Sequence, residues 1–451
     1  MSGESTLTPT RILVVGAGGR EHALAWKLGA EPGVEEVIVA PGSDAMAALP
    51  RVRRLPDVDP LDPGSVLAAA RATVAELVVV GPEAPLAAGV ADALAADGIP
   101  VFGPTAAAAR IESSKAFCHQ VAAAAGVPMA RSGAFDDAGP AIDFARSLEA
   151  AGRGVVVKAD GLAAGKGVTV ASDIDEAVAA IRVAVTAGPV VIEERLEGRE
   201  ASLIALCDGR EAVALPISRD HKRLRDGDAG PNTGGMGAYS PLPDLPDASA
   251  DGLLDRFHRP ILAELARRGS PFRGALYAGL MLTADGPVLL ECNARFGDPE
   301  TQAILPRLAG PLGPWLLAAA RGRLAAAGVP SPDAARLPVL PEATVAVVLA
   351  AAGYPEASRH DDTIIGLDRI AVYGALVFHS GTVRSATGGY RTAGGRVLAV
   401  VGRGDDLAAA RDVADRAAEW IVFDGAQRRR DIAADALADG PTPGSSVEAG
   451  P

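Results

Sequence analysis

The chain has 451 residues and a formal net charge of −13, which suits three or four packed units and argues against a surface that binds nucleic acid through its phosphates. Although 49% of its residues are apolar, no apolar run approaches the roughly 20 residues that a membrane-spanning helix needs. The first ten residues, MSGESTLTPT, do not resemble a secretion signal. The three cysteines lack the spacing of a metal site and are odd in number, which disfavours a zinc site or a disulfide framework. We expect them to be buried apolar residues. We therefore expect a cytoplasmic multidomain enzyme.

Residues 11–112 alternate β-rich runs with Ala- and Leu-rich helical stretches, the runs being RILVVG, VEEVIVA, ELVVVG and IPVFG. Alternation of this kind predicts a parallel α/β, Rossmann-like unit. We expect residues 1–10 before it to be a disordered polar leader.

Residues 113–327 form a second predicted unit of the α+β class. Glycine turns separate the runs GVVVKA, KGVTVAS and PVVIEERL, which predicts a small antiparallel flap lobe at about 128–195. Four further strands follow, and the Asp285-Gly286 turn joins the last two as a hairpin. Between the second and third of these strands, we interpret residues 218–250 as a long polar loop.

A proline-rich joint near 328–342 precedes three more β-rich runs and a final amphipathic helix. This pattern predicts a separate C-terminal mixed α/β unit at 342–437. We expect residues 441–451 to be a disordered tail.

Only five of the 43 basic residues are lysine, namely Lys27, Lys115, Lys158, Lys166 and Lys222. Arginine and lysine are equivalent on a solvated face but differ in a site that needs a compact ammonium group. Each lysine is therefore a candidate functional group, although biased codon usage would leave the same pattern.

In the segment RILVVGAGGREHALAWKL, a β-run ends in a glycine turn that opens a helix. Such a turn can hold phosphate. The third glycine of a dinucleotide fingerprint is replaced by Glu21. Three interpretations stay open: a purely structural turn, a nicotinamide cofactor site, or a phosphorylated substrate bound at Gly18, Gly19, Arg20 and Glu21.

The segment VVVKADGLAAGKGVTVAS places Gly161, Gly165 and Gly167 between two β-runs, which predicts a hairpin flap. It does not match a P-loop, because only three residues separate the first two glycines and Gly167 follows Lys166. Lys158 can point into a cleft while backbone N–H groups of the tip close over phosphate oxygens. A plain flexible hairpin is the alternative.

A strand leaves the flap lobe through VVIEERLEGRE. Its main-chain groups could read an adenine ring, and a nearby carboxylate could bind ribose hydroxyls. Taken alone, the segment fits a solvated acidic turn better.

The segment PVLLECNARFGDPET is the most informative. Side chains alternate along a strand, so Glu291 and Asn293 face one side while Leu290 and Cys292 face apolar packing. Two oxygen donors of this type suit Mg²⁺. Arg295 and Asp298 follow close by.

The polar segment SRDHKRLRDGDAGPNTGGMGAYSP is too long for an ordinary connection, and loops of this length are usually functional or disordered. Met236 and Tyr239 within it disfavour disorder. We interpret it as a substrate-facing loop with Asp220 and Lys222 near the chemistry, whereas His221 fits either a structural or a catalytic role.

Together these motifs resemble the ATP-grasp family, in which a small lobe and a larger sheet clamp ATP. The motifs GAGGREHALAWKL, VGPEAPLAAGV, ESSKAF, VVVKADGLAAGKGV, GPNTGGMGAYSP and RFGDPETQ carry the resemblance, and AAGYP, VFHSGT and GGRVLAVVG extend it to about residue 402. The chain departs from the family pattern at Ala17, Ala294 and Ala393. The change at Ala17 removes one possible polar contact near the phosphoribosyl site.

The resemblance implies that ATP phosphorylates the carboxylate of glycine and that the amine of 5-phosphoribosylamine attacks the acyl phosphate, in purine biosynthesis. It implies roles for the following residues: Lys115, Lys158, Gly161, Gly165, Lys166, Gly167, Glu193, Glu194, Leu196 and Glu200 on ATP; Gly18, Gly19, Arg20, Glu21, Glu83, Asp220, Lys222, Gly235, Met236 and Arg295 on substrates; Glu291 and Asn293 on Mg²⁺ or Mn²⁺; and Lys158, Arg295 and Asp298 in catalysis. We expect a monomer without nucleic-acid or membrane partners. Another ATP-grasp ligase or carboxylase of purine synthesis, a nicotinamide oxidoreductase and a nucleotide sensor are the alternatives.

Overall fold

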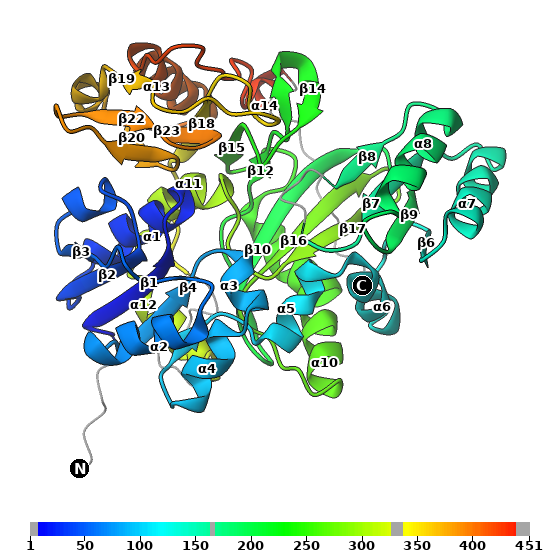
Figure 1. Ribbon diagram of the computed structural model, residues 1–451, viewed down its shortest axis with the longest axis horizontal. Coiled ribbons are helices and arrows are strands. Elements are labelled where there is room, and N and C mark those ends of the chain that lie inside the picture. Colours follow the sequence, from blue (N-terminus) through cyan, green and yellow to red (C-terminus); the bar gives the residue numbers. More distant parts are fainter. Residues whose placement is uncertain (1–7, 163–166, 326–336, 439–451) are drawn as a thin grey trace, which may run out of the picture.

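The computed structural model describes residues 8–162, 167–325 and 337–438. Figure 1 shows the N-terminal unit in blue and the C-terminal unit in orange and red at one end of the molecule, with a smaller lobe projecting at the other. No helix within the described residues is both long and apolar enough to cross a membrane.

The N-terminal unit contains a five-stranded parallel sheet of order β3-β2-β1-β4-β5, which confirms the alternating pattern. Its central strand is fully buried at Ile12, Leu13 and Val14, as expected where helices cover both faces of a parallel sheet. The elements are β1 (Arg11–Gly16), α1 (Gly19–Gly29), β2 (Glu36–Pro41), β3 (Val52–Arg54), α2 (Pro63–Ala72), β4 (Leu77–Val80), α3 (Glu83–Ala87), α4 (Val90–Ala96) and β5 (Val101–Phe102).

Two helices, α5 (Ala106–Ser113) and α6 (Lys115–Ala124), connect this unit to the rest. Ser114 ends the first helix and caps the second, because its hydroxyl accepts a hydrogen bond from Phe117 N at 3.1 Å. Lys115 is therefore the first residue of α6.

The small lobe is an antiparallel sheet of order β6-β9-β7-β8 with its own apolar core. Two helices pack beside it and bury Leu148 and Ile181 completely. The elements are β6 (Ser132–Phe135), α7 (Ala138–Ala150), β7 (Val155–Ala159), β8 (Val168–Val170), α8 (Ile174–Ala184) and β9 (Val190–Glu194).

The central sheet has the order β11-β10-β16-β17 and is antiparallel throughout. The predicted hairpin is present, since Thr283 pairs with Gly286 where its two long strands meet. The main elements are β10 (Arg199–Asp208), β11 (Ala212–Ala214), α10 (Arg259–Arg267), β16 (Arg273–Thr283), β17 (Gly286–Asn293), α11 (Glu300–Ile304) and α12 (Gly313–Ala320).

The prediction of a long loop at 218–250 is wrong. Residues 219–240 contain four short strands, and two of them join the C-terminal sheet, whose order is β12-β15-β18-β23-β20. The glycine-rich composition hid a strand, Gly237–Ser240, whose four residues are all buried. The elements are β12 (Arg219–Asp220), β13 (Arg223–Arg225), β14 (Ala229–Asn232), β15 (Gly237–Ser240), β18 (Ala343–Ala350), β20 (Leu376–His379), β23 (Arg396–Gly404), α13 (Leu407–Trp420) and α14 (Ala434–Ala438).

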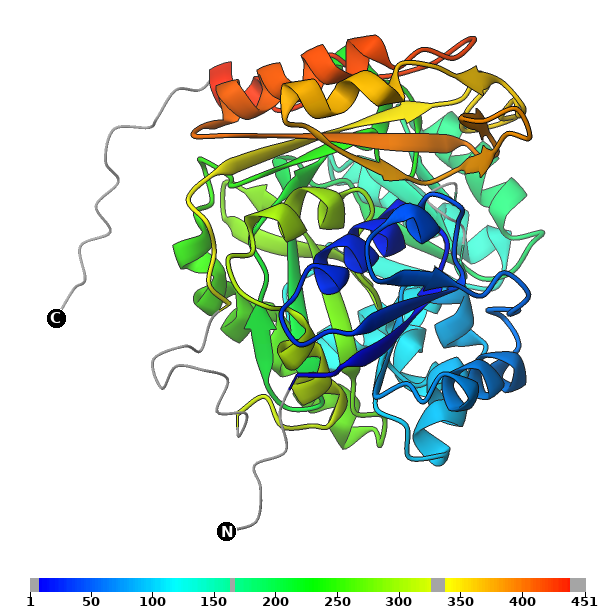
Figure 2. The same ribbon diagram turned by 90° about the vertical axis from the view of Figure 1, so that its left-hand side faces the viewer.

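Figure 2 shows the C-terminal sheet and α13 lying across the N-terminal and central units. Between the latter two, Lys27 Nζ donates to Leu308 O at 2.8 Å. Glu31 accepts hydrogen bonds from Leu312 N at 2.6 Å and Gly313 N at 2.9 Å, at the start of α12. Lys27 is thus an inter-unit contact, which removes it from the candidate functional lysines.

Candidate active site

A cavity of about 1160 Å³ has walls from all parts of the molecule. Arg20 comes from the N-terminal unit, Lys158 from the small lobe, Glu291 from the central sheet and Arg396 from the C-terminal sheet. A volume above the roughly 300–1,000 Å³ typical for one small ligand leaves room for a nucleotide together with a second substrate.

Glu291 and Asn293 both line this cavity from the end of β17. They pair with Gly279 and Tyr277 on β16, so they lie two residues apart on the same strand face. Cys292 between them is buried, with 3% of its surface exposed. The arrangement expected for two oxygen donors on one face is therefore present.

Leu290 does not follow the predicted alternation. The pairing register shifts between Gly279 and Leu280, and Leu290 is left without a partner in the ladder. A bulge of this kind re-aims the strand. Leu290 consequently lines the cavity, and its carbonyl accepts a hydrogen bond from Lys158 Nζ at 3.1 Å.

The donor set at the end of β17 fits a divalent cation that is shared with phosphate oxygens. Lys222, whose ammonium lies 3.6 Å from the carboxylate, lowers the pKa of Glu291 to about 2, so this carboxylate is ionised at neutral pH. Within the described residues there is no cluster of three or more His, Cys, Asp or Glu side chains that could hold a metal alone. One carboxylate and one amide oxygen leave coordination positions for phosphate and water, as Mg²⁺ prefers.

Lys158 faces the cavity from β7 through a chain of polar contacts. Its ammonium lies 2.8 Å from Glu193, and the other carboxylate oxygen of Glu193 is 2.7 Å from His119 Nε2. Ser132 Oγ is 2.8 Å from His119 Nδ1. Glu193 is 3% exposed. Although burial acts to raise its pKa, Lys158 and His119 outweigh burial and lower it.

Lys115 lies at the base of the flap. Its ammonium donates to Gly161 O at 2.9 Å, and its backbone N–H donates to Asp160 at 2.5 Å. Burial is the largest influence on Lys115 and lowers its pKa. Gly161 and Gly167 both line the cavity, whereas Gly165 and Lys166 lie outside the described residues.

The segment that leaves the small lobe lines the cavity through Glu194, Leu196 and Glu200. Glu194 accepts a hydrogen bond from Arg131 N at 3.0 Å and pairs with Arg153. Glu200 instead lies 2.8 Å from Lys222 Nζ.

Asp220 and Lys222 both line the cavity at the start of the segment predicted to face substrate. Burial raises the pKa of Asp220 well above its ordinary value, and neighbouring carboxylates act in the same direction. Burial would lower the pKa of Lys222, but Glu200 and Glu291 outweigh it and raise that pKa. Lys222 is therefore a fixed positive charge between two carboxylates.

Arg295 is held by two carboxylates from other parts of the chain. Its Nε lies 3.0 Å from Glu83 and 3.1 Å from Glu112. Burial opposes the charge of Arg295, but Glu112 and Glu83 outweigh it and raise its pKa. Asp298 also lines the cavity and faces Arg396, at 3.3 Å, and Gln302, at 2.8 Å.

The glycine turn before α1 differs from the phosphate site that its sequence suggests. Gly18 N donates to the side chain of Glu21 at 2.7 Å, so a carboxylate of the chain itself occupies the helix start. Arg20 Nε lies 2.5 Å from the same carboxyl group. Of the four predicted residues Gly18–Glu21, only Arg20 lines the cavity.

Gly235 and Met236 also lie off the cavity wall. Gly235 has φ +111° and packs against Pro299, where a side chain would collide. Met236 is fully buried in an apolar cluster with Leu224 and Ala350. Their contact with substrate stays a prediction, although the adjacent Thr233 and Gly234 do line the cavity.

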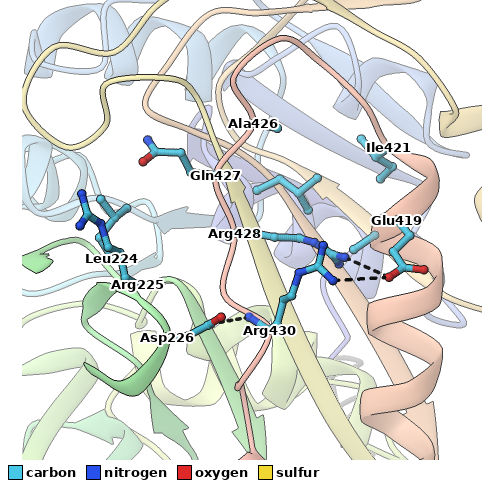
Figure 3. A pocket seen from close by; sticks show the side chains of 11 residues that line it. Leu224, Arg225, Asp226, Glu419, Ile421, Ala426, Gln427, Arg428 and Arg430 are labelled. Atoms are coloured by element: carbon cyan, nitrogen blue, oxygen red, sulfur yellow. Dashed lines mark hydrogen bonds and ion pairs between the residues drawn. The ribbon is translucent and has the colours of Figure 1, made fainter. Parts of the chain in front are cut away.

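A second cavity, of about 500 Å³, lies between the β13–β14 hairpin and the end of α13. Figure 3 shows Arg428 and Arg430 directed at Glu419, at 3.5 and 4.0 Å, and Asp226 facing the backbone of Arg430. Because these groups pair with one another, we assign no ligand to this cavity.

Sequence reasoning missed several residues of the cavity wall: Glu112, His119, Arg219, Tyr277, Glu300 and Arg396. Glu112 and His119 flank Lys115 at a spacing of three and four residues, and that proximity was the available indication. Arg396 reaches the cavity because it lies on β23 of the C-terminal sheet, and the local sequence does not specify how that sheet packs.

The sequence matches three family models that together cover most of the chain. These are the phosphoribosylglycinamide synthetase N domain over residues 10–112, its ATP-grasp (A) domain over 113–301 and its C domain over 344–435. A phosphoribosylamine–glycine ligase of Streptomyces coelicolor is 49% identical, covering 94% of this chain and 99% of that protein. The enzyme of the same name from Caulobacter vibrioides is 46% identical, covering 93% and 97%.

Solved structures agree with this assignment. The crystal structure of a phosphoribosylamine–glycine ligase from Thermotoga maritima has a TM-score of 0.77 and 32% identity, covering 94% of this chain and 100% of that one. The biotin carboxylase domain of a Hydrogenobacter thermophilus 2-oxoglutarate carboxylase, in complex with MgADP, has a TM-score of 0.68 at 17% identity, covering 93% and 92%. The second likeness concerns the fold alone. With all three domain models and near-complete coverage, the chain belongs to the phosphoribosylglycinamide synthetase family, whose central domain is an ATP-grasp domain.

Proposed function

We propose that the chain joins glycine to 5-phosphoribosylamine at the expense of ATP, giving glycinamide ribonucleotide, ADP and phosphate in purine biosynthesis. The observation that carries the proposal is the approach of Lys158 to the end of β17, where its ammonium bonds Leu290 O at 3.1 Å beside Glu291. The ammonium group of Lys158, close to the two oxygen donors of β17, is suited to bind a triphosphate together with its metal ion.

The first step is attack by a carboxylate oxygen of glycine on the γ-phosphorus of ATP. A P–O bond forms to the carboxylate, the P–O bond to the bridging oxygen breaks, and ADP leaves. Glycine is already ionised at neutral pH, so no general base is needed. The requirement is to neutralise charge on the transferring group, and we assign Lys115, Lys158 and Arg295 to it.

We propose that Glu291 and Asn293 hold Mg²⁺ or Mn²⁺. When bound, the ion neutralises phosphate charge and orients the phosphate chain. The ionised state of Glu291 and the two hard oxygen donors on one face support this assignment.

In the second step the amine nitrogen of 5-phosphoribosylamine attacks the carbonyl carbon of the glycyl phosphate. The C–N bond forms, the C–O bond to phosphate breaks, and the nitrogen loses a proton. Water would hydrolyse the acyl phosphate, so the flap around Gly161 and Gly167 must cover the site before chemistry. We place the acyl phosphate between Lys222, Arg295 and Asp298.

We place adenosine against Glu194, Leu196 and Glu200, at the exit from the small lobe. Glu193 supports the phosphates indirectly, since it already pairs with Lys158. Arg20 and Glu83 reach the cavity from the N-terminal unit, beside Pro82, and we assign the phosphoribosyl group to their side.

We propose that the monomer is the active unit, since the N-terminal unit, the small lobe, the central sheet and the C-terminal sheet of one chain all contribute residues to the cavity. Light scattering during turnover tests this: an assembly that loses activity on dilution to monomers contradicts it.

The decisive experiment measures ADP release with each substrate omitted in turn. We expect release only when ATP, a divalent metal, glycine and 5-phosphoribosylamine are all present. Release that requires bicarbonate instead of glycine would identify a carboxylase of the same fold, and oxidation of NADH at 340 nm would identify an oxidoreductase.

A further inference from the structure

The chain returns to the active-site wall near its C-terminal end. Residues 429–435, here called the C-terminal segment, contact the β13–β14 hairpin through Arg429, Arg430 and Asp431. Arg429, Asp431, Ala434 and Asp435 of this segment line the main cavity.

Arg429 is the anchor of this contact. Only 1% of the residue is exposed. Its guanidinium donates to Asp228 at 2.5 Å, to Arg223 O at 3.3 Å, and to both carboxylate oxygens of Asp431 at 2.7 Å. One planar group therefore ties the start of β13 and the last residue of the hairpin turn to the C-terminal segment.

Two further bonds fix the tip of the hairpin. Gly227 N donates to Asp431 at 2.8 Å, and Arg430 N donates to Asp226 at 2.7 Å, the second contact being visible in Figure 3. Burial alone would raise the pKa of Asp431, but the bonds from Arg429 and Gly227 outweigh it and lower that pKa to about 2. The bonded carboxylate is thus ionised at all working pH values.

The hairpin begins directly after the two residues assigned to chemistry, Asp220 and Lys222. His221 between them faces Asp228 at 3.9 Å and Asp435 at 3.9 Å, and its Nε2 accepts a hydrogen bond from Ala433 N at 3.4 Å. Displacement of the hairpin would therefore move Lys222 relative to Glu200 and Glu291.

Resting on the proposed function, we infer that Arg429 is a positioning residue for glycine activation. Arg429 holds the turn 226–228, and this turn determines the position of Lys222. Lys222 in turn positions the carboxylate of glycine that attacks ATP. Misplacement of a reacting group by about 1 Å can cost on the order of 100-fold in rate. The adenosine side of the cavity, at Glu194 and Leu196, lies at the exit from the small lobe, and among the described residues Arg429 has no hydrogen bond or ion pair with that lobe.

The test compares Arg429→Lys with the neighbouring Arg428→Ala. Lysine keeps the charge but cannot donate a fork to Asp228 and Asp431 together. Arg428 instead pairs with Asp415 and Glu419 on α13, at 3.8 and 3.5 Å. We expect R429K to lower kcat/KM for glycine about tenfold or more, while the KM for ATP stays within about twofold and R428A stays near wild type.

Equal losses for ATP and glycine in R429K would mean a merely structural role and overturn the inference, as would unchanged kcat/KM for glycine. If R429K does not fold, Asp228→Asn carries the test, because the Asp228 side chain is 68% exposed and its exchange leaves no buried cavity. We expect the same glycine-selective loss, smaller in size, and its absence would again overturn the inference. Failure of the proposed function is distinguishable, since wild type itself would then show no glycine-dependent ADP release.

Discussion

The carboxylate of Glu193 lies 2.8 Å from the ammonium of Lys158 and holds that cation at the cavity wall. Replacement of Lys158 by methionine removes the charge that we propose faces the triphosphate. We expect kcat/KM for ATP to fall by about 100-fold or more, the usual effect of losing one group that stabilises transition-state charge. The measurement is the initial rate of ADP release.

Lys27→Met is the matched control, since Lys27 bonds Leu308 O and does not line the cavity. This variant should keep wild-type turnover while its free energy of unfolding falls by about 1 kcal/mol, the net value of a hydrogen bond. Equal loss of turnover in both lysine variants would remove the special role of Lys158.

Two stacked histidines between the N- and C-terminal units predict a loss of stability in acid. Burial lowers the pKa of His22 to about 3 and that of His379 to about 4, whereas the unfolded chain has values near 6.5. Above pH 6.5 both states are neutral and the stability is complete. Below it the unfolded state binds protons first, so the free energy of unfolding falls by about 1.4 kcal/mol per pH unit for each histidine until the folded values are reached.

Urea titrations between pH 7 and pH 5 measure this slope. His22 Nδ1 accepts a hydrogen bond from His379 N at 3.0 Å, which an asparagine oxygen can accept instead. His22→Asn should therefore reduce the slope by the share of one histidine, and an unaltered slope would show that other groups control acid stability.

Val74 sits in a left-handed conformation, with φ +50°, just after α2. Its neighbour Ala75 N bonds Ala70 O at 3.0 Å, and Val74 N bonds Arg71 O at 3.1 Å, which is the pattern of a helix end that favours glycine. The side chain is 64% exposed, so little packing is lost on its removal. We expect Val74→Gly to raise the free energy of unfolding by about 1 kcal/mol, measured by urea denaturation.

Ala72→Gly, at the last residue of the same helix, is the control and should lower stability by about 0.5–1 kcal/mol. A loss in both variants would mean that Val74 is not strained.

The sequence predicted those parts of the site that depend on local pattern. The alternation of β-rich and helical runs predicted the parallel sheet, and the glycine spacing near Lys158 predicted the flap. The two-residue period of a strand predicted that Glu291 and Asn293 share one face. Each of these follows from residues close together in the chain.

Parts that depend on long-range packing escaped prediction. Residues 237–240 pair with β18 about a hundred positions away, and no local pattern specifies that partner. Glu21 is a local exception: it fills the helix start that was expected to take phosphate, and its spacing of three residues from Gly18 could have indicated this contact. Arg429 contacts a hairpin some two hundred residues earlier in the chain, and the sequence around Arg429 does not indicate this partner.

We propose that Glu291 anchors the metal ion on which phosphoryl transfer depends. The measurement is glycine-dependent ADP release by Glu291→Ala, with Asp285→Ala at the exposed tip of the same hairpin as control and thermal unfolding of both. We expect no detectable ADP from the first variant, wild-type turnover from the second and unchanged folding of each. Wild-type ADP release by a folded Glu291→Ala protein would contradict it.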